Sequence, residues 1–226
     1  MLSIMSIAEN LHSIENSLQG SPARLVAVTK THPPEVLKEA YEAGARVFGE
    51  NKVQEMVAKW EVLPKDIEWH LIGHLQSNKV KYVAPFVSLI HSVDSFKLLK
   101  EIDRQAEKAG RVIDCLLQIY IAQEETKFGL STEEAEELLL SDDLAGLEHV
   151  RIIGLMGMAS NTGNQDQVRA EFRSLKQFFD HLKVSLPVRD NCQMYELSMG
   201  MSGDYPLAVA EGSTLVRVGS AIFGSR

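Results

Sequence analysis

Apolar residues form two alternating patterns along the chain: short continuous runs, and stripes in which they recur every three or four positions. Residues 4–18 carry such a stripe, which places the apolar side chains on one face of a helix. Residues 25–29 and 215–218 are examples of the continuous runs, which are typical of strands buried on both faces. The sequence therefore predicts a leading helix followed by strands that alternate with helices.

Strand–helix units follow the leading helix along the whole chain. The strands are predicted at residues 25–29, 46–48, 69–72, 87–90, 115–121, 152–156, 195–197 and 215–218. The first helical segment is predicted to start after Pro34 and to end near Gly44. The others are predicted at residues 54–60, 79–83, 96–109, 132–140, 168–182, 205–211 and 220–223. Strands that alternate with helices form a parallel sheet whose faces the helices cover.

Eight strands are the number that closes a (β/α)8 barrel, and 226 residues are near the typical length of that fold. We therefore predict an α/β protein: a single TIM-like (β/α)8 barrel domain over residues 1–226, with an extra N-terminal helix. An open doubly wound sheet is the alternative. No stretch rich in Pro, Gly or Ser divides the sequence into two parts.

The composition is that of an ordinary folded protein, with 45% hydrophobic and 24% charged residues. A formal net charge of −8 argues against a general electrostatic affinity for nucleic acid or anionic membranes, so an anionic ligand needs local donors. Cys115 and Cys192 have no metal-binding spacing and fit a reducing compartment. No apolar run approaches the roughly 18 residues of a membrane span. We expect a soluble cytoplasmic protein.

In a barrel of this kind, functional groups gather beyond the carboxyl ends of the strands. Lys30 follows the first strand, where a partly desolvated amine can lose its proton and attack a carbonyl group. The alternative is a solvated surface lysine, which is the commoner case. Arg217 lies within the last apolar strand, and a buried guanidinium needs an acceptor. That acceptor is either a ligand or a strand-end carboxylate such as Glu50 or Glu196.

The last strand is followed by Gly219 and Ser220, in the region where barrels often bind phosphate through backbone N–H groups. Residues 198–202 read Ser-Met-Gly-Met-Ser, a small-residue turn that could complete a phosphate cup. The alternatives are an ordinary helix cap and a tight turn whose methionines fill gaps. His70 and His74 fall on a strand and its following loop rather than on one helix face, so we assign no metal site.

Several short segments, taken in order, carry a specific resemblance. They are residues 27–30, 48–51, 69–73, 75–79, 124–129, 154–156, 197–202 and 216–219. Through them the chain resembles the pyridoxal phosphate homeostasis protein family, relatives of the barrel domain of bacterial alanine racemases, which are fold-type III proteins. Tyr120 departs from the family, which usually has Asn at this position, so the polar contacts on that wall of the pocket are left open.

The resemblance implies that pyridoxal 5′-phosphate (PLP) is the cofactor, linked to Lys30 as an internal aldimine. It also implies that the phosphate lies near Ser198, Gly219 and Ser220, that the pyridine nitrogen faces Arg217, and that Asn51 is a further pocket residue. A permanently charged Arg disfavours protonation of that nitrogen and should weaken carbanion chemistry. No catalytic residue is assigned.

The resemblance also implies that alanine racemases use a tyrosine from a separate β domain as an acid/base group. The sequence to Arg226 is taken up by the predicted barrel, so we expect no such domain here. An open cofactor site with little or no catalysis is therefore expected. The resemblance implies a role in intracellular vitamin B6 homeostasis and in amino-acid and keto-acid balance. PLP-dependent apoenzymes are candidate recipients, and we expect a monomer.

Two other functions are left open by the sequence. One is a PLP-dependent amino-acid racemase or another fold-type III enzyme. The other is a cofactor-free lyase that uses the Lys30 amine on a sugar phosphate.

Overall fold

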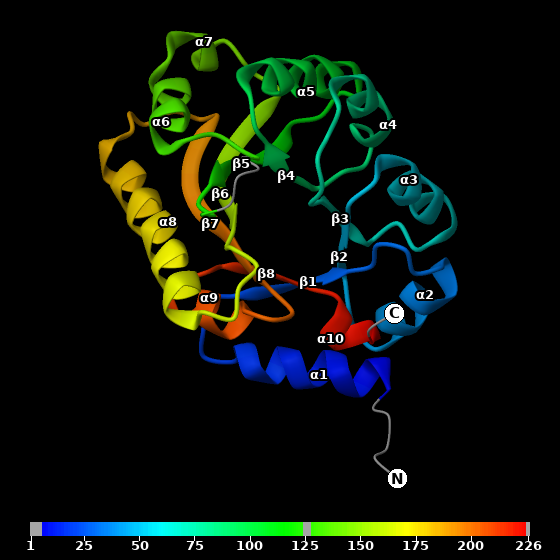
Figure 1. The fold of residues 1–226 in the computed structure, drawn as a ribbon. Helices are drawn as coiled ribbons and strands as arrows, with labels where there is room; N and C mark the ends of the chain where they lie inside the picture. The colour runs from blue at the N-terminus through cyan, green and yellow to red at the C-terminus, as the bar shows by residue number, and fades with distance from the viewer. Residues whose placement is uncertain (1–5, 124–127, 225–226) are drawn as a thin grey trace.

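The strands form a closed parallel barrel in the order β1 to β8, as a computed structural model of the chain shows for residues 6–123 and 128–224 (Figure 1). The barrel closes where β1 (Arg24–Val28) pairs with β8 (Leu215–Val218), in a register that sets Ala27 beside Val218. This pairing confirms the predicted (β/α)8 barrel, because an open doubly wound sheet has no bond between its first and last strands.

The predicted elements agree closely with the observed ones. The other strands are β2 (Val47–Glu50), β3 (Glu68–Leu71), β4 (Leu89–Val93), β5 (Ile113–Tyr120), β6 (Val150–Met158) and β7 (Cys192–Met201). The helices are α1 (Ile7–Leu18), α2 (Pro34–Glu42), α3 (Val53–Val62), η1 (Ser77–Lys79), α4 (Val80–Val83), α5 (Phe96–Lys108), α6 (Thr132–Leu140), α7 (Asp142–Ala145), α8 (Gln165–Ser185), α9 (Tyr205–Ala210) and α10 (Ser220–Phe223). The short helix α7 was not predicted, and β7 is longer than expected.

Helix α1 is the predicted extra N-terminal helix. Ser6 caps it by accepting a hydrogen bond from the Glu9 amide, and the Glu9 side chain accepts one from Ser6 in return. Its apolar face is buried, and the Asn10 side chain donates a 2.9 Å hydrogen bond to the carbonyl oxygen of Ile222 in α10. Helix α1 therefore packs beside α10, as Figure 1 shows. Residues 4 and 5 of the prediction lie outside the described residues.

Two apolar clusters fill the structure, one on each side of the strands. The larger cluster joins the strands to the surrounding helices. The smaller one contains Val26, Leu89, Leu116, Ile153, Met156 and Leu215. Because these residues come from strands all around the barrel, they meet in its interior, which is a packed core as in other barrels of this class.

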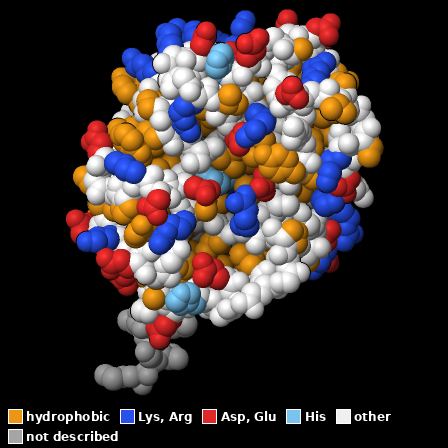
Figure 2. Space-filling model, turned by 180° about the vertical axis from the view of Figure 1, so that it is seen from behind, with side chains coloured by type: hydrophobic (Ala, Val, Ile, Leu, Met, Phe, Trp, Pro, Cys, Tyr) orange, Lys and Arg blue, Asp and Glu red, His pale blue; other side chains and the backbone are white. Residues whose placement is uncertain are grey.

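Charged side chains of both signs are mixed on one face of the molecule. Figure 2 shows Lys and Arg side chains interspersed with Asp and Glu on one face of the molecule. Such a mixed surface gives no strong single-sign field for binding nucleic acid. Within the described part of the chain, no helix has the length and apolar character needed to cross a membrane.

Gly154 provides a test of how tightly β6 and β7 pack. A Cβ atom at this position would lie 1.7 Å from the carbonyl oxygen of Glu196, a backbone atom that cannot move aside. We expect Gly154→Ala to lower the free energy of unfolding by about 3 kcal/mol, as overpacking does in close-packed cores. Urea unfolding measures the loss. Gly163→Ala is the control, because a Cβ there meets nothing within 4 Å. Equal midpoints for the two variants would contradict the close approach.

Candidate functional site

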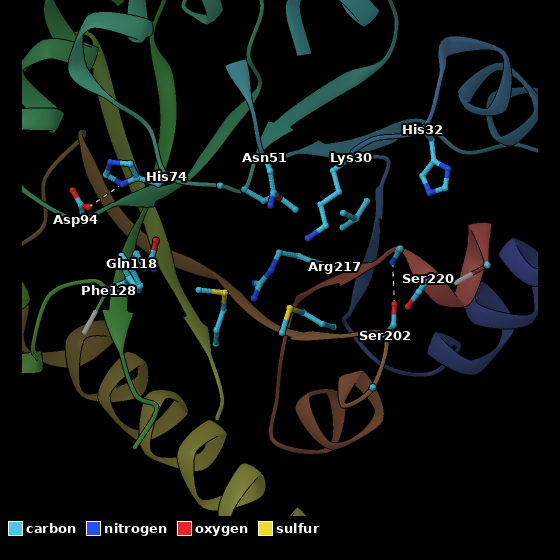
Figure 3. A pocket seen from close by; sticks show the side chains of 18 residues that line it. Lys30, His32, Asn51, His74, Asp94, Gln118, Phe128, Ser202, Arg217 and Ser220 are labelled. Atoms are coloured by element: carbon cyan, nitrogen blue, oxygen red, sulfur yellow. Dashed lines mark hydrogen bonds and ion pairs between the residues drawn. The ribbon is translucent and has the colours of Figure 1, made fainter. Parts of the chain in front are cut away.

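An open cavity of about 670 Å3 lies at the carboxyl ends of the barrel strands. Lys30, Asn51 and Asp94 enter it just after β1, β2 and β4, while Arg217 enters from β8 (Figure 3). This is the end of the barrel at which functional groups are expected. The cavity therefore brings together residues that are far apart in the sequence.

Lys30 and Arg217 approach each other in this cavity. Lys30 is an exposed residue two positions after the end of β1, and its side chain extends toward Arg217 (Figure 3). Arg217 is 4% exposed and lies on the barrel floor. The site thus combines an amine at the rim with a guanidinium below it.

Among the described residues, Arg217 has hydrogen-bond partners but no ion-pair partner. Its Nη1 donates to Ser198 Oγ at 2.5 Å and its Nη2 donates to the Gly157 carbonyl oxygen at 3.1 Å. Among the described residues, no carboxylate lies within ion-pair distance of it. Burial lowers the pKa of Arg217 to about 10, so the guanidinium is charged at neutral pH. A buried cation of this kind favours an anion or a lone-pair acceptor in the cavity.

The two carboxylates considered as structural partners of Arg217 are bonded elsewhere. Glu50 accepts from Lys59 at 2.6 Å, and Glu196 accepts from Arg24 at 2.5 Å. The expected alternative, an ion pair of Arg217 with Glu50 or Glu196, is therefore wrong. Both carboxylates already have a cation on a neighbouring element.

A buried hydrogen-bond chain continues below Arg217. Ser198 Oγ lies 3.0 Å from His91 Nδ1, and His91 Nε2 lies 3.0 Å from His70 Nδ1. Burial lowers the pKa of His70 to about 3 and the pKa of His91 well below its ordinary value, so both rings are neutral. Since Arg217 can only donate, Ser198 accepts from it and donates to His91, which donates to His70. The chain supports Arg217 from beneath without adding charge.

Ser198 differs from the prediction. It was expected beside a bound phosphate, but it is fully buried and does not line the cavity. The reason is that β7 continues to Met201, so Ser198 is an interior strand residue and not part of a loop. It lies below Arg217, whose Nη1 donates to the Ser198 hydroxyl.

Ser202 lines the cavity at the place where Ser198 was expected. Its hydroxyl accepts a hydrogen bond from the backbone N–H of Gly219 at 3.1 Å (Figure 3). It accepts a second one from the backbone N–H of Ala221 at 3.4 Å. With both of these bonds accepted, the hydroxyl hydrogen remains available for a ligand oxygen. Gly219 and Ser220 line the same edge, and a Cβ on Gly219 would lie 3.0 Å from the Val28 carbonyl oxygen. Ser202, Gly219 and Ser220 thus form one polar edge.

Asn51 lies between this polar edge and the opposite wall, as predicted for a pocket residue. Asn51 is half-buried, and Gly73 packs on its backbone. A Cβ atom on Gly73 would lie 2.4 Å from the Asn51 carbonyl oxygen.

The opposite wall contains residues that we did not nominate from the sequence. His74 and Asp94 face each other at 3.5 Å, and both follow strand ends, which is the signal that could have identified them.

The remaining wall is formed by Gln118 and by the apolar side chains of Phe128, Met158 and Met201. Tyr120, the departure from the family pattern, does not line the cavity, whereas Gln118 on the same strand does. Residues 124–127 of the family segment lie outside the described residues. Over the described ranges, no group of three His, Cys, Asp or Glu side chains could hold a metal ion.

The cavity fits a small anionic carbonyl compound. The Lys30 amine and the Arg217 guanidinium face into it, and the polar edge adds hydroxyl donors for an anionic group. An amine beside a fixed anion site can be held within reach of a bound aldehyde, which is the requirement for forming a covalent link.

Comparisons with known proteins show which family the chain resembles. Residues 2–226 match the family described as alanine racemase, N-terminal domain. A relative from Aquifex aeolicus, named pyridoxal phosphate homeostasis protein, is 42% identical over 205 residues, which cover 90% of this chain and 87% of the relative. The structure of PipY from Synechococcus elongatus without PLP matches with a TM-score of 0.89 and 41% identity. PipY with PLP bound gives 0.85 and 40%, and in both cases 97% of this chain and 100% of PipY are covered.

Proposed function

The chain belongs to the alanine racemase N-terminal domain family and, within it, to the pyridoxal phosphate homeostasis proteins, and from this premise we propose that it binds PLP in the cavity between Lys30 and Arg217. The observation that carries the proposal is the meeting of Lys30, Arg217 and the Ser202–Gly219 edge in one cavity. PipY, at 40% identity, has been solved with PLP bound.

Each side chain has a separate task in this proposal. Lys30 would supply the amine that holds the cofactor through its aldehyde group, with loss of one water. Ser202, Gly219 and Ser220 bind the phosphate, and Asn51 contacts the cofactor beside them. Arg217 faces the pyridine nitrogen, and Ser198 acts through Arg217 and not on the phosphate.

The environment of the ring nitrogen favours holding the cofactor over catalysis. PLP supplies an electron sink for amino-acid chemistry when its ring nitrogen is protonated. A charged Arg217 disfavours that protonation. Among the described residues that line the cavity, none is a tyrosine that could serve as the second acid/base group. We infer little or no turnover, and no observation favours the racemase.

The open cavity supports a role in vitamin B6 homeostasis, because cofactor can enter and leave from the rim. We infer that residues 1–226 act as one PLP-binding unit, as a monomer in the cytoplasm, which buffers PLP or passes it to PLP-dependent apoenzymes. Through that pool the protein would affect amino-acid and keto-acid balance.

Borohydride reduction with peptide mass mapping tests the proposal. Purified protein mixed with PLP should absorb visible light, lose that absorbance on reduction, and carry a pyridoxyl group on Lys30. The chemical reason is that only a C=N bond is fixed by reduction. Protein reduced without added PLP, after dialysis against hydroxylamine, is the control.

Other outcomes identify the alternatives. A label on another lysine would remove Lys30 from the site. A preparation that stays colourless with PLP would favour the cofactor-free lyase. Rapid interconversion of L- and D-amino acids would favour a racemase.

A further inference from the structure

Lys59 is a buried lysine whose function the cavity does not explain. It lies on α3, is 3% exposed and does not line the cavity. Its Nζ donates to the Thr29 carbonyl oxygen at 2.8 Å, to Glu50 Oε1 at 2.6 Å and to Glu55 Oε1 at 2.8 Å. A lysine is rarely buried unless it is paired, and here the whole ammonium group is used.

The partners of Lys59 lie on both sides of Lys30. Thr29 directly precedes Lys30 in the chain. The Glu55 carboxylate, which accepts from Lys59, also accepts from the backbone N–H of Thr31, the residue directly after Lys30. Lys59 and Glu55 are one helical turn apart on α3. A single ion pair on this helix therefore holds the backbone before and after the Lys30 side chain.

Thr31 shows why the backbone needs to be held. Its φ is +67°, and it is the one non-glycine residue with positive φ in the part of the chain that the structure describes. For a β-branched residue this conformation is a true outlier and is strained. The Thr31 N–H donates to Glu55. The Lys30 side chain extends into the cavity (Figure 3).

We propose that Lys59 and Glu55 form a clamp that positions Lys30, by fixing Thr29 and by holding Thr31 in its strained conformation. The clamp residues do not touch the cofactor, so they are positioning residues. The proposal rests on the function inferred for Lys30 and adds to it the device that directs the amine toward the cavity.

The first test does not involve PLP. Amide hydrogen exchange at Thr31 is followed by NMR in wild type, Glu55→Gln and Lys59→Met. We expect exchange at Thr31 to be about tenfold faster in both variants, because the acceptor of this N–H is weakened or released. Lys52→Met is the control, since it removes a charge near Glu55 at the start of the same helix but breaks no hydrogen bond to Thr29, Thr31 or Glu55. Unchanged exchange in Glu55→Gln would overturn the clamp.

The second test measures the rate at which PLP is captured on Lys30, followed by absorbance and fixed by borohydride. Glu55→Ala should slow capture by about tenfold or more, as misplacement of a reacting group does. The double variant Glu55→Ala/Thr31→Gly should recover most of the wild-type capture rate, because glycine adopts positive φ without steric strain. A purely structural role for Glu55 predicts no such recovery.

The outcomes separate the clamp from the proposed function. Wild-type capture rates in Glu55→Ala, with Lys30 labelled normally in wild type, would overturn the clamp and leave the function intact. No label on Lys30 in wild type would overturn the function, and amide exchange would then decide on the clamp alone. Since loss of Lys59 leaves Glu50 buried without its cation, the conclusion rests on the Glu55 variants if Lys59→Met does not fold.

Discussion

Lys30→Met should abolish covalent capture of PLP while the barrel stays folded. The side chain is exposed at the cavity rim, so its removal costs little stability. Among the described residues, no other lysine lines the cavity. The substitution leaves Arg217 and the polar edge of Ser202, Gly219 and Ser220 unchanged. The borohydride-fixed fraction should fall by about 100-fold, because a positioned intramolecular amine is replaced by encounters with solvent-exposed lysines.

The comparison variant for this experiment is Lys52→Met, which removes an exposed lysine at the start of α3. It should be labelled like wild type. Non-covalent binding of PLP to Lys30→Met should persist at reduced affinity, as measured by equilibrium dialysis. Full labelling of Lys30→Met at one other lysine would show that the covalent position had been assigned incorrectly.

The barrel could be predicted from the sequence because its strands are buried on both faces and its helices on one. Those two patterns depend only on local burial, so β8 at Leu215–Val218 and α6 at Thr132–Leu140 were predicted with the observed bounds. Helix α7 was missed because it follows α6 directly. Ser141 ends α6 and caps α7, so no polar stretch separates the two helices.

The site was predicted less completely, and the errors have a common cause. The end of β7 is set by its pairing with β6 and β8, with a register shift between Ser198 and Met201 that no local pattern reveals. Ser198 was therefore assigned to a loop. The ion pairs that remove Glu50 and Glu196 from Arg217 depend on Lys59 and Arg24, which lie on other elements. Long-range packing decided each of these contacts.

Arg217→Glu should raise the pKa of the bound cofactor's ring nitrogen. In wild type the guanidinium is charged and has no carboxylate within ion-pair distance among the described residues, so it opposes a second positive charge beside it. A carboxylate at the same position stabilises that charge. We expect an upward shift of about 1–3 pKa units, so that the ring nitrogen becomes protonated at neutral pH.

The shift can be measured by titrating the absorbance of the bound cofactor from acidic to alkaline pH, or by NMR of PLP labelled with 15N in the ring. Arg217→Met is the matched control, because it removes the cation without adding a carboxylate and should give an intermediate pKa. If both variants titrate like wild type, Arg217 does not face the ring. Its bonds to Ser198 and Gly157 would then make it a structural residue of the barrel floor, with the His91–His70 chain as its support.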